Sequence, residues 1–297
     1  MKNFLKKLLS PSTINRKLIK LGGEIKSFMK DKNKSNDDEN YDYFYGDGTK
    51  SHSQEDLYKN DIKVAMTTNE KGESVFLSCN VNKSWSDLGE EIDELNVLAP
   101  DAVLVSDAEP ELKKALVTAE RKYQIDFIHF IRDIGYKLWK DNTLNLDTRK
   151  NMKKYAEEII YKLKNQTKKY AKNKKALKIK INEAVDKLKE FSEYSHEINC
   201  KKTAEFVNKH SNTVVTFAIL TVEGKSIPWN SNIIERLMGE IQKRCKHKWM
   251  RWTTQGQETL LNLILTRYTN PENYKEFQNQ KLKTKNKNNI QTKITIT

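Results

Sequence analysis

Three strand-like runs open the ordered pattern of the chain. In the first, tyrosines recur at every second position from residue 41 to 45, which predicts a strand with one buried face. We expect this strand to end at the Gly-Asp-Gly-Thr step of residues 46–49. Residues 61–68 and 74–82 are the other two runs, and the turn-forming stretch between them predicts a hairpin.

Strands then alternate with helices. Residues 84–98 place apolar side chains on one helix face, and the run at 102–106 is almost continuously apolar, as expected of a strand buried on both faces. A second helix follows Pro110, and residues 123–131 predict a fifth strand or a strand-to-helix junction. Three strands followed by alternating strands and helices predict an α/β fold with one mixed sheet.

From about residue 141 to residue 210 the apolar spacing is helical and no strand pattern is visible, and we expect residues 141–229 to form a mainly helical insertion. Lysines crowd the other helix faces. A charge run of this kind usually solvates an exposed helix surface. The alternative is a surface that follows DNA. Two more segments with helical spacing, at 230–249 and 254–268, predict helices that close the fold.

Both ends of the chain are basic and poor in core-forming residues. The N-terminal part predicts a short basic helix, capped near Ser12 or Thr13 and interrupted at Gly22-Gly23. A polar linker follows at residues 31–40. We therefore expect a basic helix with its linker, the first part of an α/β core, a helical insertion, the C-terminal helices of the core and a disordered basic tail. Their boundaries are 1–40, 41–140, 141–229, 230–278 and 279–297.

The chain has 297 residues, with 54 Lys and Arg against 40 Asp and Glu, a formal net charge of +14. This balance favours a polyanionic partner, nucleic acid before membrane, although a lysine-rich composition also follows from an AT-rich genome. No apolar run approaches the roughly 20 residues that span a bilayer, and no signal-peptide pattern is present. Cys79, Cys200 and Cys245 lie far apart without a CxxC pair, which favours a reducing compartment. We expect a soluble cytoplasmic protein with no membrane partner.

Two carboxylates follow strand runs, where an α/β fold gathers its chemistry, and a third candidate lies in a helix. Asp47 lies between two glycines at the end of the first strand run, and Asp107 follows the buried strand run. Each has a plainer interpretation, a turn aspartate for Asp47 and a helix cap for Asp107. Glu235 is the third, although with Asn232 as N-cap it also fills the reciprocal position of a capping box. Glu240 is a rival on a different face of the same helix.

Four segments together resemble insertion-sequence transposases of bacteria and archaea that are related to the eukaryotic Mutator-like elements. "YFYGDGTKSH" looks like the first-strand segment of that family, "VLVSDAEPELKKAL" like its second-acid segment and "NIIERLMGEIQKR" like its third. "DFIH" matches the D/C-x-x-H motif of the family through Asp126 and His129. The stretch "KHKWMRWTTQGQETLLNLILTRY" is similar to the C-terminal segment of archaeal members, and the resemblance covers roughly residues 41 to 278.

The resemblance implies a ribonuclease H-like fold with an all-helical insertion between the second and third catalytic acids. Asp47, Asp107 and Glu235 would form a DDE triad that holds two Mg²⁺ or Mn²⁺ ions about 3.5–4 Å apart. Such hard cations prefer carboxylate oxygens and keep positions open for phosphate and water. Asp47 would bridge both ions from the central strand, and a glycine on each side would leave room for metal and phosphate beside it.

Two further groups of residues are candidates for DNA-adjacent or structural roles. Asp126 and His129 are too few to form a zinc site. We favour a structural or DNA-adjacent role for them, and the alternative is a buried, hydrogen-bonded histidine. "KHKWMRW" interleaves aromatics with cations, a pattern suited to stacking on an unpaired base, although its tryptophans also fit a hydrophobic core. Its candidate residues are Lys246, His247, Lys248, Trp249, Arg251 and Trp252.

The implied activity is metal-dependent cleavage and strand transfer of an insertion element. The implied partner is double-stranded DNA, as transposon ends and target, bound by a homodimer or a larger assembly. Members of the family carry a longer N-terminal region with helix-turn-helix elements. We therefore expect a chain without a full N-terminal DNA-binding region, either a truncated copy or the product of an internal start. Two alternatives stay open: a catalytically inactive DNA-binding remnant, and a hydrolytic nuclease of the same fold.

Overall fold

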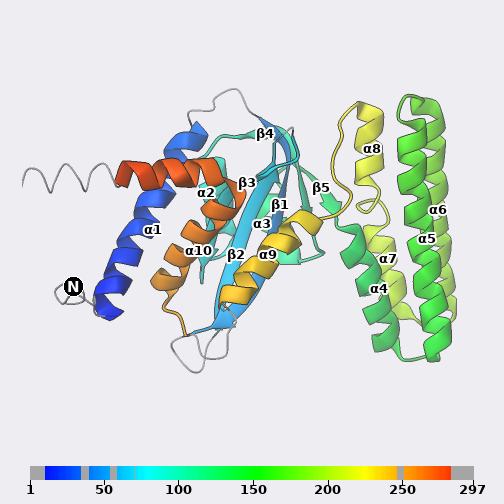
Figure 1. Cartoon of the computed structure of the whole chain (residues 1–297). Coiled ribbons are helices and arrows are strands. Elements are labelled where there is room, and N and C mark those ends of the chain that lie inside the picture. Colours follow the sequence, from blue (N-terminus) through cyan, green and yellow to red (C-terminus); the bar gives the residue numbers. More distant parts are fainter. Residues whose placement is uncertain (1–10, 35–39, 54–58, 70, 246–250, 282–297) are drawn as a thin grey trace, which may run out of the picture. The chain divides into compact units, whose positions relative to one another are not determined.

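The computed structural model of the chain describes residues 11–34, 40–53, 59–69, 71–245 and 251–281 (Figure 1). The chain divides into two compact units. Unit 1 comprises Met1–Tyr41, Asp47–Leu98 and Ile233–Thr297, and unit 2 comprises Asp42–Gly46 and Ala99–Asn232. Within the described residues, every helix is too short or too polar to cross a membrane.

One sheet of five strands lies in the described part of the chain, in the order β3-β2-β1-β4-β5. The β2 and β3 strands pair antiparallel, whereas β4 and β5 pair parallel. The expected α/β fold with one mixed sheet is therefore confirmed. The strands are β1 (Tyr41–His52), β2 (Lys59–Thr68), β3 (Ser74–Val81), β4 (Leu98–Ser106) and β5 (Lys122–Ile125).

Helices make up most of the remaining described chain. Local sequence sets several of their starts: α2 begins with a capping box formed by Ser84 and Asp87, and the side chains of Asn145 and Asn173 cap α5 and α6. Residues 141–229, expected to be helical, contain α5 to α8 and no strand. The helices are α1 (Pro11–Lys34), α2 (Trp85–Asp93), α3 (Pro110–Leu116), α4 (Phe127–Asp141), α5 (Leu146–Tyr170), α6 (Lys174–Glu197), α7 (Lys201–His210), α8 (Thr216–Glu223), α9 (Asn232–Cys245) and α10 (Thr254–Thr269), and a further helix covers residues 271–281.

The hairpin expected after the first strand is present between β2 and β3. The register runs from Ile62 opposite Val81 to Thr68 opposite Ser74. In the turn, the N–H of Gly72 donates to the carbonyl of Asn69 over 2.9 Å. Gly72 has a φ of +76°, which a glycine adopts without steric cost, so this residue type is what lets the turn close.

The β1 strand is longer than its sequence predicts. It continues through the Gly-Asp-Gly-Thr step to His52, so the expected end at residues 46–49 and the turn-aspartate interpretation of Asp47 are both wrong. The far half of the strand is held by distant residues. Gln257 of α10 donates to the hydroxyl of buried Ser51 over 2.6 Å, and the Trp252 N–H donates to the His52 carbonyl over 3.3 Å.

The α1 helix runs unbroken through Gly22-Gly23, so the expected interruption there is wrong. A Cβ atom on Gly22 would lie 2.4 Å from Cγ2 and 2.7 Å from Cα of Thr259 in α10, whereas a Cβ on Gly23 would meet nothing within 4 Å. Gly22 therefore lets two helices approach closely and does not end either of them. The helix also takes in residues 31–34, which were expected to belong to the linker.

The helical part of unit 2 (α4 to α8, green to yellow in Figure 1) begins and ends at residues that are far apart in the sequence but adjacent in space. The N–H of Phe127, the first residue of α4, donates to the carbonyl of Trp229 over 3.2 Å. Their rings are 5.0 Å apart between centroids. The segment that leaves the sheet after β5 therefore returns to its starting point before α9 begins.

Candidate active site

Asp107 follows directly after β4, at the carboxyl end of a buried strand. Its Oδ1 atom accepts from the N–H of Glu109 over 3.2 Å, and its carbonyl accepts from the hydroxyl of Tyr123. Glu109 occupies the N-cap position of α3 without a side-chain cap hydrogen bond, so Asp107 is not the helix cap that one interpretation predicted. The Asp107 side chain is one-third exposed, which leaves its carboxylate accessible.

The imidazole of His129, in the first turn of α4, lies beside Asp107. Its Nδ1 atom is 3.9 Å from Oδ2 of Asp107 and 3.2 Å from Nη2 of Arg132. A guanidinium group only donates hydrogen bonds, so Arg132 is the donor in the contact with His129. The distance of 3.9 Å is too long for a hydrogen bond. His129 therefore acts on Asp107 as a close polar neighbour, while Arg132 fixes the orientation of the ring.

Asp133 completes this group, which we call the Asp107 cluster (Asp107, His129, Arg132 and Asp133). Burial raises the pKa of the Asp133 carboxyl, and the negative charge of Asp107 raises it further, against the opposing effects of Arg132 and His129. Sequence reasoning missed Arg132 and Asp133. Their signal was the spacing, because they follow His129 by three and four positions on the same helix.

Asp126 has a structural role at the start of α4. Its side chain is buried and caps the helix, with Oδ1 accepting from the N–H of His129 over 2.7 Å. Its Oδ2 accepts from both the N–H and the hydroxyl of Ser231, the residue before α9. Donors on two segments thus satisfy both oxygens, as a buried carboxylate requires.

Asp47 lies in β1 with a partly buried side chain, and its Oδ1 atom accepts from the N–H of Gly48 over 2.7 Å. The flanking glycines face helix side chains. A Cβ on Gly46 would lie 3.3 Å from Cδ1 of Leu112, and one on Gly48 would lie 3.4 Å from the ring of Trp85. Successive side chains of a strand point to opposite faces. Gly46 therefore admits the Leu112 side chain on the face opposite Asp47, and the expectation that the two glycines leave room for metal and phosphate stays a prediction.

The two acids of α9 have different surroundings. Glu240 forms ion pairs with Lys243 at 2.7 Å and with Arg244 at 2.6 Å. Both pairs lower the pKa of Glu240, and the hydrogen bond from Arg244 has the larger effect. Glu235 is half-buried in the first turn of the helix. The capping-box interpretation required Asn232 to be the N-cap, which precedes the first helical residue. In the structure Asn232 is itself the first residue of α9. The choice of Glu235 over Glu240 as the third acid stays a prediction.

Of the basic and aromatic candidates near the C-terminus, residues 246–249 lie outside the described residues. Arg251 is exposed, and Trp252 is partly buried. The carbonyl of Trp252 accepts from the side-chain amide of Asn60 over 3.0 Å, and its N–H donates to His52. The backbone of Trp252 therefore fastens this part of the chain to β1 and β2.

The chemistry of the donor set fits a divalent cation, because carboxylate oxygens are the ligands that Mg²⁺ and Mn²⁺ prefer. Among the residues that the structure describes, no three His, Cys, Asp or Glu side chains form a group able to hold a metal ion. Asp47 and Glu235 belong to unit 1 and Asp107 to unit 2. The expected convergence of these three carboxylates stays a prediction.

Comparison of the chain with models of known protein families finds no match, and none of the curated proteins matches it.

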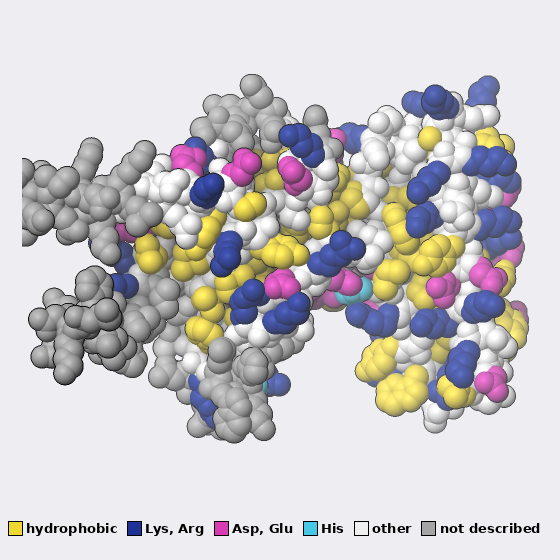
Figure 2. All heavy atoms as spheres, viewed as in Figure 1, with side chains coloured by type: hydrophobic (Ala, Val, Ile, Leu, Met, Phe, Trp, Pro, Cys, Tyr) yellow, Lys and Arg dark blue, Asp and Glu magenta, His cyan; other side chains and the backbone are white. Residues whose placement is uncertain are grey.

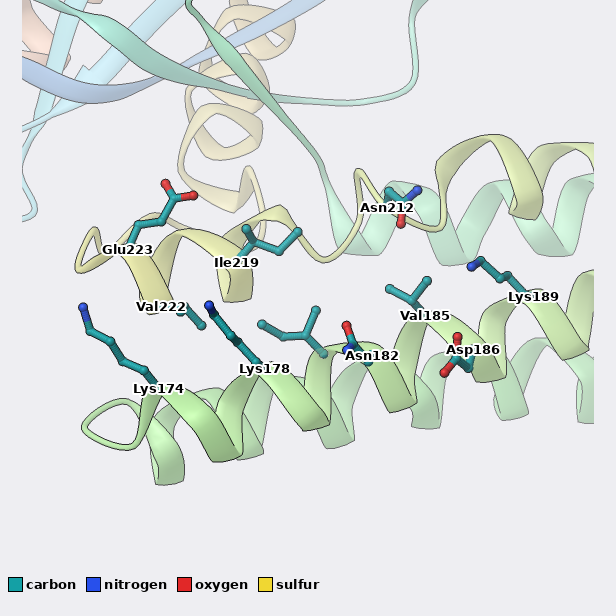
Figure 3. A pocket seen from close by; sticks show the side chains of 11 residues that line it. Lys174, Lys178, Asn182, Val185, Asp186, Lys189, Asn212, Ile219, Val222 and Glu223 are labelled. Atoms are coloured by element: carbon teal, nitrogen blue, oxygen red, sulfur yellow. The ribbon is translucent and has the colours of Figure 1, made fainter.

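A groove of about 680 Å³ lies between α6 and α8 in unit 2 (Figure 3). Lys174, Lys178 and Lys189 of α6 line it together with Ile219 and Val222 of α8. None of the candidate acids or of the other candidate site residues contributes to its lining. The groove is therefore separate from the Asp107 cluster.

Proposed function

We propose that the chain is a DDE transposase with a ribonuclease H-like core, which cleaves DNA at the ends of an insertion element and joins those ends to target DNA. The observation that carries the proposal is the 3.9 Å approach of Asp107 and His129. These residues come from two separate segments that resemble transposase motifs, and each motif alone is common. They meet at the carboxyl end of a buried strand, which is where ligand sites of open α/β sheets form.

In this proposal Asp47, Asp107 and Glu235 hold two Mg²⁺ or Mn²⁺ ions. When bound, these ions activate the attacking water or 3′-hydroxyl and stabilise the leaving oxygen of the phosphodiester. The Glu109 N–H donates to one oxygen of Asp107 and restricts the orientation of the carboxylate, while His129 borders the other oxygen without a hydrogen bond. Arg132 is exposed enough, at 61% of its side chain, to contact a phosphate as well as His129.

The proposed partner is double-stranded DNA, bound by two or more copies of the chain. The net charge of +14 supports a polyanionic partner. Figure 2 shows Lys and Arg side chains spread over α5 and α6 of unit 2. Contacts between these side chains and DNA phosphates would give affinity without base recognition, because each contact neutralises a phosphate whatever the DNA sequence.

The test compares cleavage of a labelled transposon end with gel-shift affinity at matched salt. Asp47→Asn, Asp107→Asn and Glu235→Gln are expected to abolish Mg²⁺-dependent nicking and to leave DNA binding intact or slightly stronger, because each removes an anionic ligand but no phosphate contact. Glu240→Gln is the matched control on the same helix and should cleave like the wild type.

Nicking by Asp107→Asn, or wild-type nicking that survives EDTA, would contradict the metal-dependent mechanism. Strand-transfer products from a paired-end substrate distinguish a transposase from a hydrolytic nuclease. Wild-type protein that binds DNA and cleaves under no condition would identify an inactive remnant.

A further inference from the structure

One face of α4 is exposed along the length of the helix and carries large side chains. It consists of Ile128, Arg132, Tyr136, Trp139 and Lys140, which are spaced three to four positions apart or adjacent, as a single helix face requires. Trp139 is 60% exposed and Tyr136 is 48% exposed. Aromatic side chains of this size are usually much more buried. Their exposure side by side therefore indicates a contact surface.

The two aromatic rings are arranged as a platform. The centroids of Tyr136 and Trp139 are 5.8 Å apart, and their planes differ by 22°, so the rings lie nearly parallel. Nζ of Lys140 lies 4.7 Å from the centre of the Tyr136 ring. Each ring restricts the rotation of the other, so a ligand that stacks on them meets a surface that is already ordered.

The charges around the platform are mostly positive. Nζ of Lys202 donates to the carbonyl of Lys140 over 3.1 Å, at the end of α4. The nearby acid Asp141 is turned toward the start of α7, where its carboxylate accepts from the backbone N–H groups of Lys202 and Thr203. Arg132 stands at the other end of the same face. In Figure 2, exposed hydrophobic side chains gather where α4 ends and α7 begins, with Lys or Arg beside them.

The face begins at the Asp107 cluster, because Arg132 contacts His129 and His129 borders Asp107. The ten residues from His129 to Trp139 correspond to about 15 Å along the helix. At roughly 3.4 Å per nucleotide of stacked strand, this length matches about four nucleotides. A strand whose phosphate lies at Asp107 can therefore extend along α4 as far as the platform.

We propose that Tyr136 and Trp139 bind an unpaired base of the DNA strand that is cleaved at Asp107, with Arg132 contacting a phosphate between the two points and Lys140 contacting a phosphate beside the platform. This inference rests on the proposed function. It adds a binding site for the cleaved strand after that strand leaves the duplex. The ligand is single-stranded DNA, because flanking cations complement phosphates and flat rings complement bases. Stacking of this kind tolerates every base, so the platform selects unpaired strand without selecting sequence.

The experiment uses the full chain in EDTA, so that no cleavage occurs, with a DNA duplex that ends in a single-stranded tail. The fluorescent base 2-aminopurine is placed at successive tail positions. In the wild type, fluorescence should be quenched at one position about four nucleotides from the junction. Trp139→Ala should remove this quenching and weaken binding of the tailed DNA about tenfold, while binding of a fully paired duplex stays unchanged.

Two variants serve as controls. Trp139→Phe keeps a stacking ring and should retain most of the quenching. Tyr194→Ala removes another exposed tyrosine, 52% exposed on α6, and should behave like the wild type. Equal affinity of Trp139→Ala and the wild type for the tailed DNA would overturn the inference. An equal loss of affinity for the tailed DNA and for the fully paired duplex would also overturn it.

The outcomes separate this inference from the proposed function. A wild type that cleaves transposon ends without quenching at any tail position keeps the function and rejects the platform. A wild type that binds no DNA rejects both. Light scattering tests a further outcome. If the wild type is a dimer and the Tyr136→Ala/Trp139→Ala double variant is a monomer with unchanged DNA binding, the platform is a protein interface and the inference is rejected.

Discussion

His129 places Nδ1 3.9 Å from Oδ2 of Asp107 while Arg132 donates to the same nitrogen. Arg132 thereby orients the imidazole ring, and the same edge of the ring lies beside Asp107. In metal sites, groups that orient a ligand typically change metal affinity or activity about 10- to 100-fold when they are removed. His129 is therefore a positioning residue for Asp107 in the proposed mechanism.

His129→Ala is expected to lower nicking of a transposon end by about 10- to 100-fold and to raise the Mn²⁺ concentration needed for half-maximal nicking. DNA affinity in a gel shift should not change. His196→Ala, at an exposed position of α6, is the matched control. A His129→Ala protein with reduced nicking at an unchanged Mn²⁺ requirement would contradict a positioning role and indicate a structural one.

Acid should destabilise the fold through His210. Burial lowers the pKa of His210 to about 4, and Lys209, Lys113 and Lys137 lower it in the same direction. An unfolded histidine has a pKa of about 6.5. Between these values the unfolded state binds the proton more readily, so the stability contribution is complete above about pH 6.5 and is lost as the pH falls toward 4.

The measurement is the urea midpoint at about pH 7.5 and about pH 5 for the wild type and for His210→Gln. The difference between the two pH values should be smaller in His210→Gln, because glutamine binds no proton. His196→Gln should keep the wild-type difference. An equal pH dependence in His210→Gln and the wild type would show that another group is responsible.

Neighbouring glycines in α1 should respond oppositely to the same substitution. Gly22→Ala is expected to destabilise the protein by about 1–3 kcal/mol, because the added Cβ meets the backbone of Thr259. Gly23→Ala meets nothing and should stabilise the helix by up to about 1 kcal/mol. Chemical denaturation of both variants provides the comparison. Stabilisation by Gly22→Ala would show that α1 and α10 do not pack as described.

Loss of the Asp126 carboxylate should be strongly destabilising. Asp126→Ala leaves the Ser231 hydroxyl and N–H and the His129 N–H without their acceptor, at a cost of about 3 kcal/mol or more in the free energy of unfolding. Asp147→Ala, with a side chain 90% exposed in α5, should change stability by only about 0.5 kcal/mol or less. A comparable, small effect of both substitutions in urea unfolding would contradict the structural role of Asp126.

Periodicity was sufficient for elements whose stability depends on nearby residues. The hairpin between β2 and β3 follows from two apolar runs and a turn, and the α2 face follows from the spacing of Trp85, Leu88 and Ile92, all of which are buried. The helices between residues 141 and 229 follow from the same kind of spacing.

The wrong expectations share a physical cause, which is a partner far away in the sequence. Gly22 was expected to break a helix because its contact with Thr259 is not visible locally. The end of β1 was misplaced because Gln257 holds Ser51.

The candidate site was predictable to a similar extent. Sequence resemblance marked Asp107 and His129 separately, and only the fold brings them to 3.9 Å. Arg132 and Asp133 follow once the D-x-x-H motif is placed on a helix, because helical spacing sets their positions. The convergence of Asp47 and Glu235 with Asp107 depends on how separate segments meet, which neither spacing nor periodicity specifies.

The hydrogen bond between Phe127 and Trp229 joins the entry and exit of the helical segment. A loop whose two ends already touch adds no span between the elements that it connects, so its length is free to vary. Gain, loss or exchange of these helices during evolution would leave the path from β5 to α9 the same length. The helical segment can therefore diversify without a compensating change in β5 or in the start of α9.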